Sequence, residues 1–151
     1  AAHLPDLAGS LNNLSNQQSD TGDWQAALGS ITEAVDHYRT LTQANPAVHL
    51  PDLALSLNNL SGCQSENGDR QAALASITEA VDLFRTLTQD NPADHLPNLA
   101  MSLNNLSNQQ SDTVDCNAAL VYYTEAVEIG RALSRAIPAA HLYYNAGSLS
   151  N

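Results

Sequence analysis

The stretch SLNNLS occurs at residues 10–15, again at 56–61 and again at 102–107, so it returns at a fixed interval of 46 residues. Its leucines are spaced as on one face of a helix. Asparagine is unfavourable inside a helix and costs roughly 0.5–0.7 kcal/mol relative to alanine. The asparagines of all three copies together withhold about 3–4 kcal/mol, so we expect them to have a role that offsets this cost.

The repetition extends over the whole sequence. His3, His49, His95 and His141 are each 46 residues apart, and the segments that follow them align without a gap. The units span residues 3–48, 49–94 and 95–140, and a partial fourth unit spans 141–151. A fixed period of this size is typical of a solenoid, in which each unit buries a face against the next. We therefore expect one solenoid domain over residues 1–151 and interpret it as a fragment of a longer array.

Each unit predicts two antiparallel helices. In the first unit, apolar residues spaced by three and four indicate a helix over about residues 4–20. SDTGD at 19–23 predicts a turn, and the apolar stripe that begins at Trp24 predicts a second helix. NPA at 45–47 ends that helix, because proline disfavours helical geometry in the residue before it. The fold class is therefore all-α, with three full helix pairs and the start of a fourth.

The composition restricts the partners. The chain has 16 acidic residues and 5 basic ones, with a formal charge of −11. This charge repels nucleic acids and anionic membranes, so we expect neutral or basic partners. No segment resembles a membrane span or a signal peptide. The two cysteines, Cys63 and Cys116, do not suggest a disulfide framework and favour a reducing, cytoplasmic compartment.

Each unit resembles a tetratricopeptide repeat. That family has a large apolar residue, then leucine and a small residue in the first helix, a turn glycine, and alanine, a large residue and alanine in the second helix. The matching residues are Leu11, Leu14, Ser15, Gly22, Ala27, Ile31 and Ala34, then Leu57, Leu60, Ser61, Gly68, Ala73, Ile77 and Ala80, and finally Leu103, Leu106, Ser107, Val114, Ala119, Tyr123 and Ala126. The resemblance implies a right-handed superhelix whose first helices line a concave groove.

Some features depart from the usual repeat. The period of 46 residues exceeds the family's usual period of about 34 and resembles the long repeats of kinesin light chains and of arrays attached to signalling NTPases. Glutamine stands where the family usually has an aromatic residue, at Gln18, Gln64 and Gln110, which predicts thin packing there. Val114 replaces the turn glycine of the third unit, where a left-handed backbone is costly for a branched side chain.

The asparagines lie away from the predicted packing face. On a helical wheel the apolar face of the first helix centres near Leu11, so Gly9, Asn13, Asn16 and Asp20 lie opposite and Asn12 lies on the flank. In a tetratricopeptide array this side would line the groove, where amides can bind the main chain of an extended peptide. The alternative is that the asparagines are only solvated, or bond to one another between units. The predicted peptide-binding residues are Asn12, Asn13, Asn16, Asp20, Leu55, Asn58, Asn59, Glu66, Met101, Asn104, Asn105, Asn108 and Asp112.

Two features would set the specificity of such a groove. Leu55 and Met101 replace Gly9 in later units and offer an apolar patch. Asp20, Glu66 and Asp112 supply one carboxylate per unit, although they could equally be a solvated helix end. With no cation on this face, a neutral or basic peptide fits better than one that presents a carboxylate.

Other functions are less well supported. Equivalent atoms of successive units lie about 8–10 Å apart, too far to share a zinc ion, so we expect the histidines to precede and cap the first helices and expect no metal or cofactor. We expect no catalysis, because no nucleophile, base and orienting group stand out from the repeat. A structural spacer or self-association module remains as the alternative function, because the open ends of a solenoid can stack on other copies.

Overall fold

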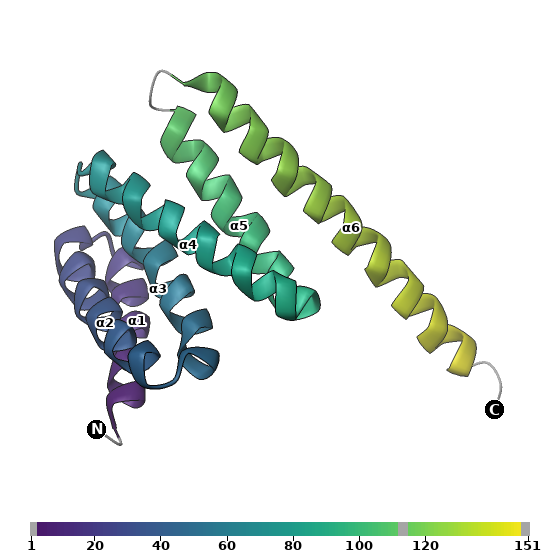
Figure 1. The fold of residues 1–151 in the computed structure, drawn as a ribbon, viewed down its shortest axis with the longest axis horizontal. Helices are drawn as coiled ribbons and strands as arrows, with labels where there is room; N and C mark the ends of the chain where they lie inside the picture. The colour runs from purple at the N-terminus through teal and green to yellow at the C-terminus, as the bar shows by residue number, and fades with distance from the viewer. Residues whose placement is uncertain (1–2, 112–114, 149–151) are drawn as a thin grey trace.

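The residues that the structure describes form six helices in succession. The computed structural model describes residues 3–111 and 115–148, with side chains as far as residue 136. The helices are α1 (Leu4–Asp20), α2 (Trp24–Ala44), α3 (Pro46–Glu66), α4 (Arg70–Asp90), α5 (Pro92–Ser111) and α6 (Cys116–Ser148). Among these described residues there is no β-strand. Each helix packs against the one before and the one after it, and α3 also touches α1 and α5 (Figure 1). The fold is therefore all-α, and antiparallel helix pairs stack in sequence as an α-solenoid.

The turn inside the first two pairs forms as its sequence predicts. Gly22 and Gly68 have φ angles of 80° and 88°, in the left-handed region that glycine adopts without strain. The side chain of Asp23 caps α2 by accepting a hydrogen bond from the amide of Ala26 at 3.2 Å. Asp69 and Asp115 repeat this cap at the starts of α4 and α6. Val114, the predicted departure from the pattern, lies outside the described residues.

The histidine prediction is wrong in the second and third units. His49 and His95 lie inside α3 and α5, because those helices begin earlier, at Pro46 and Pro92. The proline occupies the first turn, where its missing N–H costs nothing. His3 does precede α1, but its side chain makes no capping hydrogen bond.

The third unit ends differently from the first two. Asn45 and Asn91 have extended φ angles of −148° and −142°, and this backbone separates the second helix of one unit from the first helix of the next. Ile137 takes the corresponding position in the third unit, and α6 continues through it to Ser148. The described start of the predicted fourth unit is therefore the C-terminal part of α6, which extends beyond α5 in Figure 1.

Small and large apolar residues alternate along the packing face. Ala8, Ala27, Ile31, Ala34 and the equivalent residues of the second unit are fully or almost fully buried. Alanines allow close approach of the helices while Ile31, Ile77 and Phe84 fill the spaces between them. Burial raises the pKa of the Tyr38 phenol, which sits at the place of Phe84, and the nearby Asp52 carboxylate raises it further.

The glutamine positions are bonded rather than thinly packed in the first two units. Gln18 accepts a hydrogen bond from Ser30 at 2.8 Å, and Gln64 accepts one from Ser76 at 2.7 Å. Each bond joins the two helices of one unit. A polar link therefore replaces the aromatic contact that the family resemblance led us to expect.

Candidate functional site

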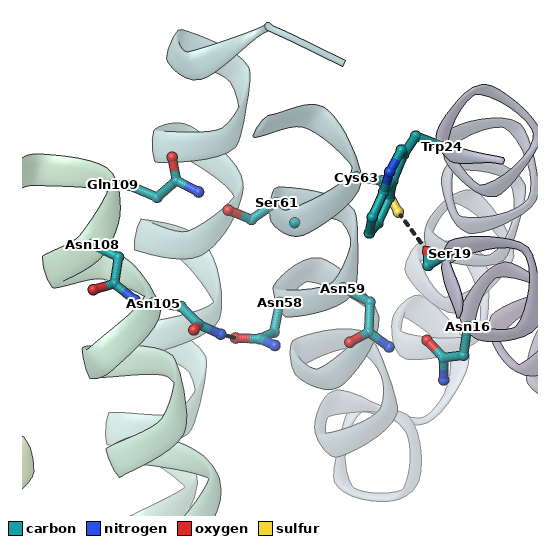
Figure 2. Close-up of a pocket in the computed structure, with 11 residues that line it drawn as sticks. Asn16, Ser19, Trp24, Asn58, Asn59, Ser61, Cys63, Asn105, Asn108 and Gln109 are labelled. Carbon is teal, nitrogen blue, oxygen red and sulfur yellow. Dashed lines mark hydrogen bonds between the residues drawn. The ribbon is translucent and has the colours of Figure 1, made fainter. Parts of the chain in front are cut away.

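A pocket lies on the side of the solenoid formed by the first helices of the three units (Figure 2). It has a volume of about 290 Å³ and is bounded by α1, α3 and α5, with one residue from the start of α2. We call it the asparagine pocket. It is lined by Asn16, Ser19, Trp24, Asn58, Asn59, Ser61, Gly62, Cys63, Asn105, Asn108 and Gln109.

The first asparagine of the first two pairs joins one unit to the next. The Oδ1 atom of Asn12 accepts hydrogen bonds from Ser56 and from Asn59, both at 3.2 Å. Asn58 repeats the pattern one unit later, with Ser102 at 3.2 Å and Asn105 at 2.9 Å. Asn58 is buried, at 8% exposure. The alternative of bonding between units therefore describes Asn12 and Asn58.

The second asparagine of the second and third pairs faces the pocket. Asn59 and Asn105 each donate one N–H to the preceding unit, as described above, and both line the pocket. A carboxamide has two N–H donors and an oxygen acceptor. The remaining donor and the oxygen of each amide have no hydrogen-bond partner within the described residues. These two amides thus combine a structural bond with unused capacity for a ligand.

More amide groups lie one helical turn away. Asn16 lies four residues after Asn12, and Asn108 lies four residues after Asn104, so they share a face with the asparagine pairs. Asn16 is exposed and forms no hydrogen bond with the described residues, whereas Asn108 accepts one from the hydroxyl of Tyr123. The pocket therefore presents amides from three successive units.

Sequence reasoning missed six lining residues. Ser61, Gly62 and Cys63 could have been found, because they follow the asparagine pair by two to five residues on the same helix, and Ser19 and Gln109 lie similarly on α1 and α5. Cys63 is buried, and its Sγ atom lies 3.6 Å from Ser19 Oγ. Trp24 belongs to α2, and no periodicity within the first helices could have indicated it.

Several predicted site residues do not line this pocket. Leu55 is partly buried and packs against the hydrophobic core. A Cβ atom at the equivalent Gly9 would lie 3.6 Å from the hydroxyl of Tyr38 in α2, so this repeat position faces the second helix. Met101, in the same position, is 39% exposed. Asn13 and Asn104 are exposed on the outermost units, and Asp112 lies outside the described residues.

The pocket itself is uncharged. None of its lining residues is acidic or basic. Asp20 and Glu66 are exposed and follow Asn16 and Gly62 by four residues, one turn further along the same helix faces. The nearest predicted carboxylates therefore lie beyond one end of the pocket.

No family model matches the sequence, and no curated protein matches it either. Within the described residues, no helix combines the length and apolar character needed to cross a membrane. The same part of the chain contains no group of three or more histidine, cysteine or acidic residues placed to hold a metal ion.

Proposed function

We propose that the chain is a tetratricopeptide-like scaffold that binds an extended, neutral or basic peptide segment across the asparagine pocket. The observation that carries the proposal is the set of amides from α1, α3 and α5 that meet at one hollow with unused donors and acceptors. An extended main chain presents the same groups at regular intervals. Amides spaced by the repeat can therefore bind it whatever its side chains.

The size and lining of the pocket favour a peptide over a compact small molecule. About 290 Å³ is at the lower limit of the pockets that enclose a drug-sized ligand. It suffices for one or two peptide side chains beside a bound main chain. The Trp24 ring and Cys63 border the pocket from neighbouring units and supply an apolar contact for such a side chain.

The charges favour a basic residue in the peptide. Asp20 and Glu66 lie one turn beyond the lining residues, and the whole chain carries a formal charge of −11. This field attracts cationic segments and repels acidic ones. No lining residue is a histidine, a carboxylate or a lysine, so we propose binding rather than catalysis and assign no cofactor. Cys63 and Cys116 are free thiols, in keeping with our proposal of a cytoplasmic location.

A blocking substitution tests the proposal. Gly62 lines the pocket, and a Cβ atom there would meet nothing within 4 Å, so we expect the ring of Gly62→Phe to occupy the hollow. The matched control is Gly29→Phe on α2, which also has open space around it and lies outside the pocket. Peptides are first selected from a random library on the unmodified chain, and their affinities are then measured by calorimetry.

We expect Gly62→Phe to abolish binding and Gly29→Phe to leave it unchanged. Asn16→Ala removes an amide that bonds no described residue, so it should weaken binding by about fivefold, the effect of roughly 1 kcal/mol. Selected peptides should be enriched in lysine and arginine. A library that yields no binder, or binders unaffected by Gly62→Phe, would contradict the proposal.

A further inference from the structure

Equivalent residues differ in exposure according to their position in the array. Leu7 in α1 is 44% exposed, whereas Leu53 and Leu99, its equivalents in α3 and α5, are 5% and 4% exposed. Leu14 behaves in the same way and is 48% exposed, against 7% and 2% for Leu60 and Leu106. These leucines are covered wherever a unit precedes them. The α1 side of the molecule is therefore one half of a contact between units.

The α6 side is the other half. Val35 and Val81 are 3% and 1% exposed because the following unit covers them, whereas Val127 at the same position in α6 is 49% exposed. Leu120 on the same helix is 64% exposed, whereas its equivalents Leu28 and Leu74 are partly buried and pack against the core. The two end faces thus present apolar residues whose equivalents are covered inside the array.

The hydrogen bonds between units leave complementary groups at the two ends. Asn12 and Asn58 each accept bonds from a serine and an asparagine of the next unit, as described above. Asn104 is the equivalent acceptor in α5, is exposed and accepts a hydrogen bond from no described residue. Ser10 and Asn13 are the equivalent donors in α1, and they are exposed and bond no described residue. The end formed by α5 and α6 therefore offers an acceptor, and the α1 end offers the two donors that match it.

The ion pairs between units follow the same rule. Arg39 in α2 binds both carboxylate oxygens of Glu79 in α4, at 2.7 and 2.8 Å, and this contact raises the pKa of Arg39. Arg85 repeats the contact with Glu125 in α6 at 2.8 Å. Glu33 in α2 is the equivalent of Glu79, and Arg131 in α6 is the equivalent of Arg85. Glu33 lies at the α1 end and Arg131 at the α6 end, so neither faces a partner from another unit. Among the described residues, Glu33 forms an ion pair only with His37 of its own helix, at 3.4 Å, and Arg131 forms none.

We infer that a second copy of this chain docks head to tail, with its α1 face on α6 and α5 of the first copy, in the register of the internal units. In that register Val127 packs against Leu7 and Leu14 of the second copy. Asn104 accepts from Ser10 and Asn13 of the second copy, and Arg131 pairs with its Glu33. The apolar, hydrogen-bonding and charged groups agree on one alignment. Because the two faces differ, the contact does not close on itself and produces chains of copies.

Sedimentation velocity over a concentration series tests this assembly. We expect a ladder of species that are multiples of 16.0 kDa and that grow with concentration. Moderate salt should favour growth, since it screens the repulsion between chains that each carry a charge of −11. A monomer at every concentration overturns the inference. A dimer that grows no further also overturns it.

Two sets of variants locate the contact. Val127→Asp places a charge in the proposed contact and should abolish assembly. The control Val48→Asp changes a valine of similar exposure, 56%, at a repeat position where the third unit already has Asp94, and it should have no effect. Equal assembly of the two variants would refute the proposed faces. Gly62→Phe should assemble normally, so peptide binding and assembly can fail separately.

Charge exchange tests the register. Arg131→Glu and Glu33→Arg should each weaken assembly by about fivefold or more, because each replaces an ion pair with a repulsive contact. The double variant restores an opposite pair at every contact and should recover most of the lost affinity. Failure of the double variant to recover, with circular dichroism showing an intact fold, would overturn the proposed alignment.

Discussion

Asn58 and Asn104 have the same sequence neighbours but different surroundings. Asn58 is buried between α3 and α5 and accepts two hydrogen bonds from the next unit. Asn104 occupies the same repeat position at the exposed α6 end and bonds no described residue. The unfavourable helix propensity of asparagine is thus offset only where another unit follows. At the residue scale, the repeated pair is a joint between units as well as a wall of the asparagine pocket.

The two residues therefore respond differently to alanine. Asn58→Ala leaves the buried hydroxyl of Ser102 without its acceptor, which should lower the free energy of unfolding by about 1–3 kcal/mol. The better helix propensity of alanine offsets roughly 0.6 kcal/mol of this loss. Asn104→Ala should only gain stability, by about 0.5 kcal/mol. Urea unfolding at low protein concentration measures both. Equal changes in the two variants would mean that the bonds between units contribute nothing.

At the scale of the helices, the third pair is joined differently from the first two. Ser15 and Ser61 donate hydrogen bonds across the pair, to the carbonyls of Ala27 and Ala73, at 2.9 and 2.7 Å. Ser107, the equivalent in α5, instead donates to Leu103 of its own helix at 2.9 Å. The buried serine thus joins the two helices of a unit in the first two units, whereas in the third unit it bonds only within its own helix.

This difference predicts unequal effects of the same substitution. Ser61→Ala removes a buried bond between α3 and α4 and should lower the free energy of unfolding by about 0.5–1.5 kcal/mol. Ser107→Ala removes a bond within one helix and should change it by less than about 0.5 kcal/mol, because alanine also has the better helix propensity. Thermal unfolding followed by circular dichroism measures both variants. A loss in Ser107→Ala as large as that in Ser61→Ala would contradict this account.

The helices could be predicted because their signals are local. The apolar spacing of residues 4–20 and the turn at 19–23 act within a few residues, and α1 and the start of α2 agree with them. The starts of α3 and α5 were placed too late, because the histidine was used to align the units whereas Pro46 and Pro92 begin the helices. α6 continues through Ile137, where the third unit lacks the Asn-Pro sequence that separates the helices of the first two units. The regular repeat made this difference easy to overlook.

The candidate site could be predicted only in part, for a reason that belongs to the whole molecule. A helical wheel placed Asn16, Asn59 and Asn108 on one face, and they do line the pocket. It could not show that Asn58 would be buried by α5, since this depends on how neighbouring units are offset. For the same reason Trp24, which enters from another helix, was missed and Leu55 was assigned to the wrong side.

The arrangement of the units also predicts where the molecule opens. α3 and α4 have a unit on each side, whereas α1 and α6 each have one uncovered face. In an array stabilised by neighbouring contacts, the ends open before the middle. Amide hydrogen exchange at low concentration should therefore be at least about tenfold slower in α3 and α4 than in α1 and α6.

Raising the protein concentration shows why the end helices exchange faster. Either one of their faces is uncovered, or these helices are intrinsically less stable. If copies dock head to tail, α1 and the described part of α6 facing it become covered, and their exchange should slow while that of α3 and α4 stays the same. The Val127→Asp variant should show the gradient at every concentration, because its end face cannot be covered. Uniform protection of the described helices would instead indicate that all units open together. The contacts between units would then be stronger than the residues that form them suggest.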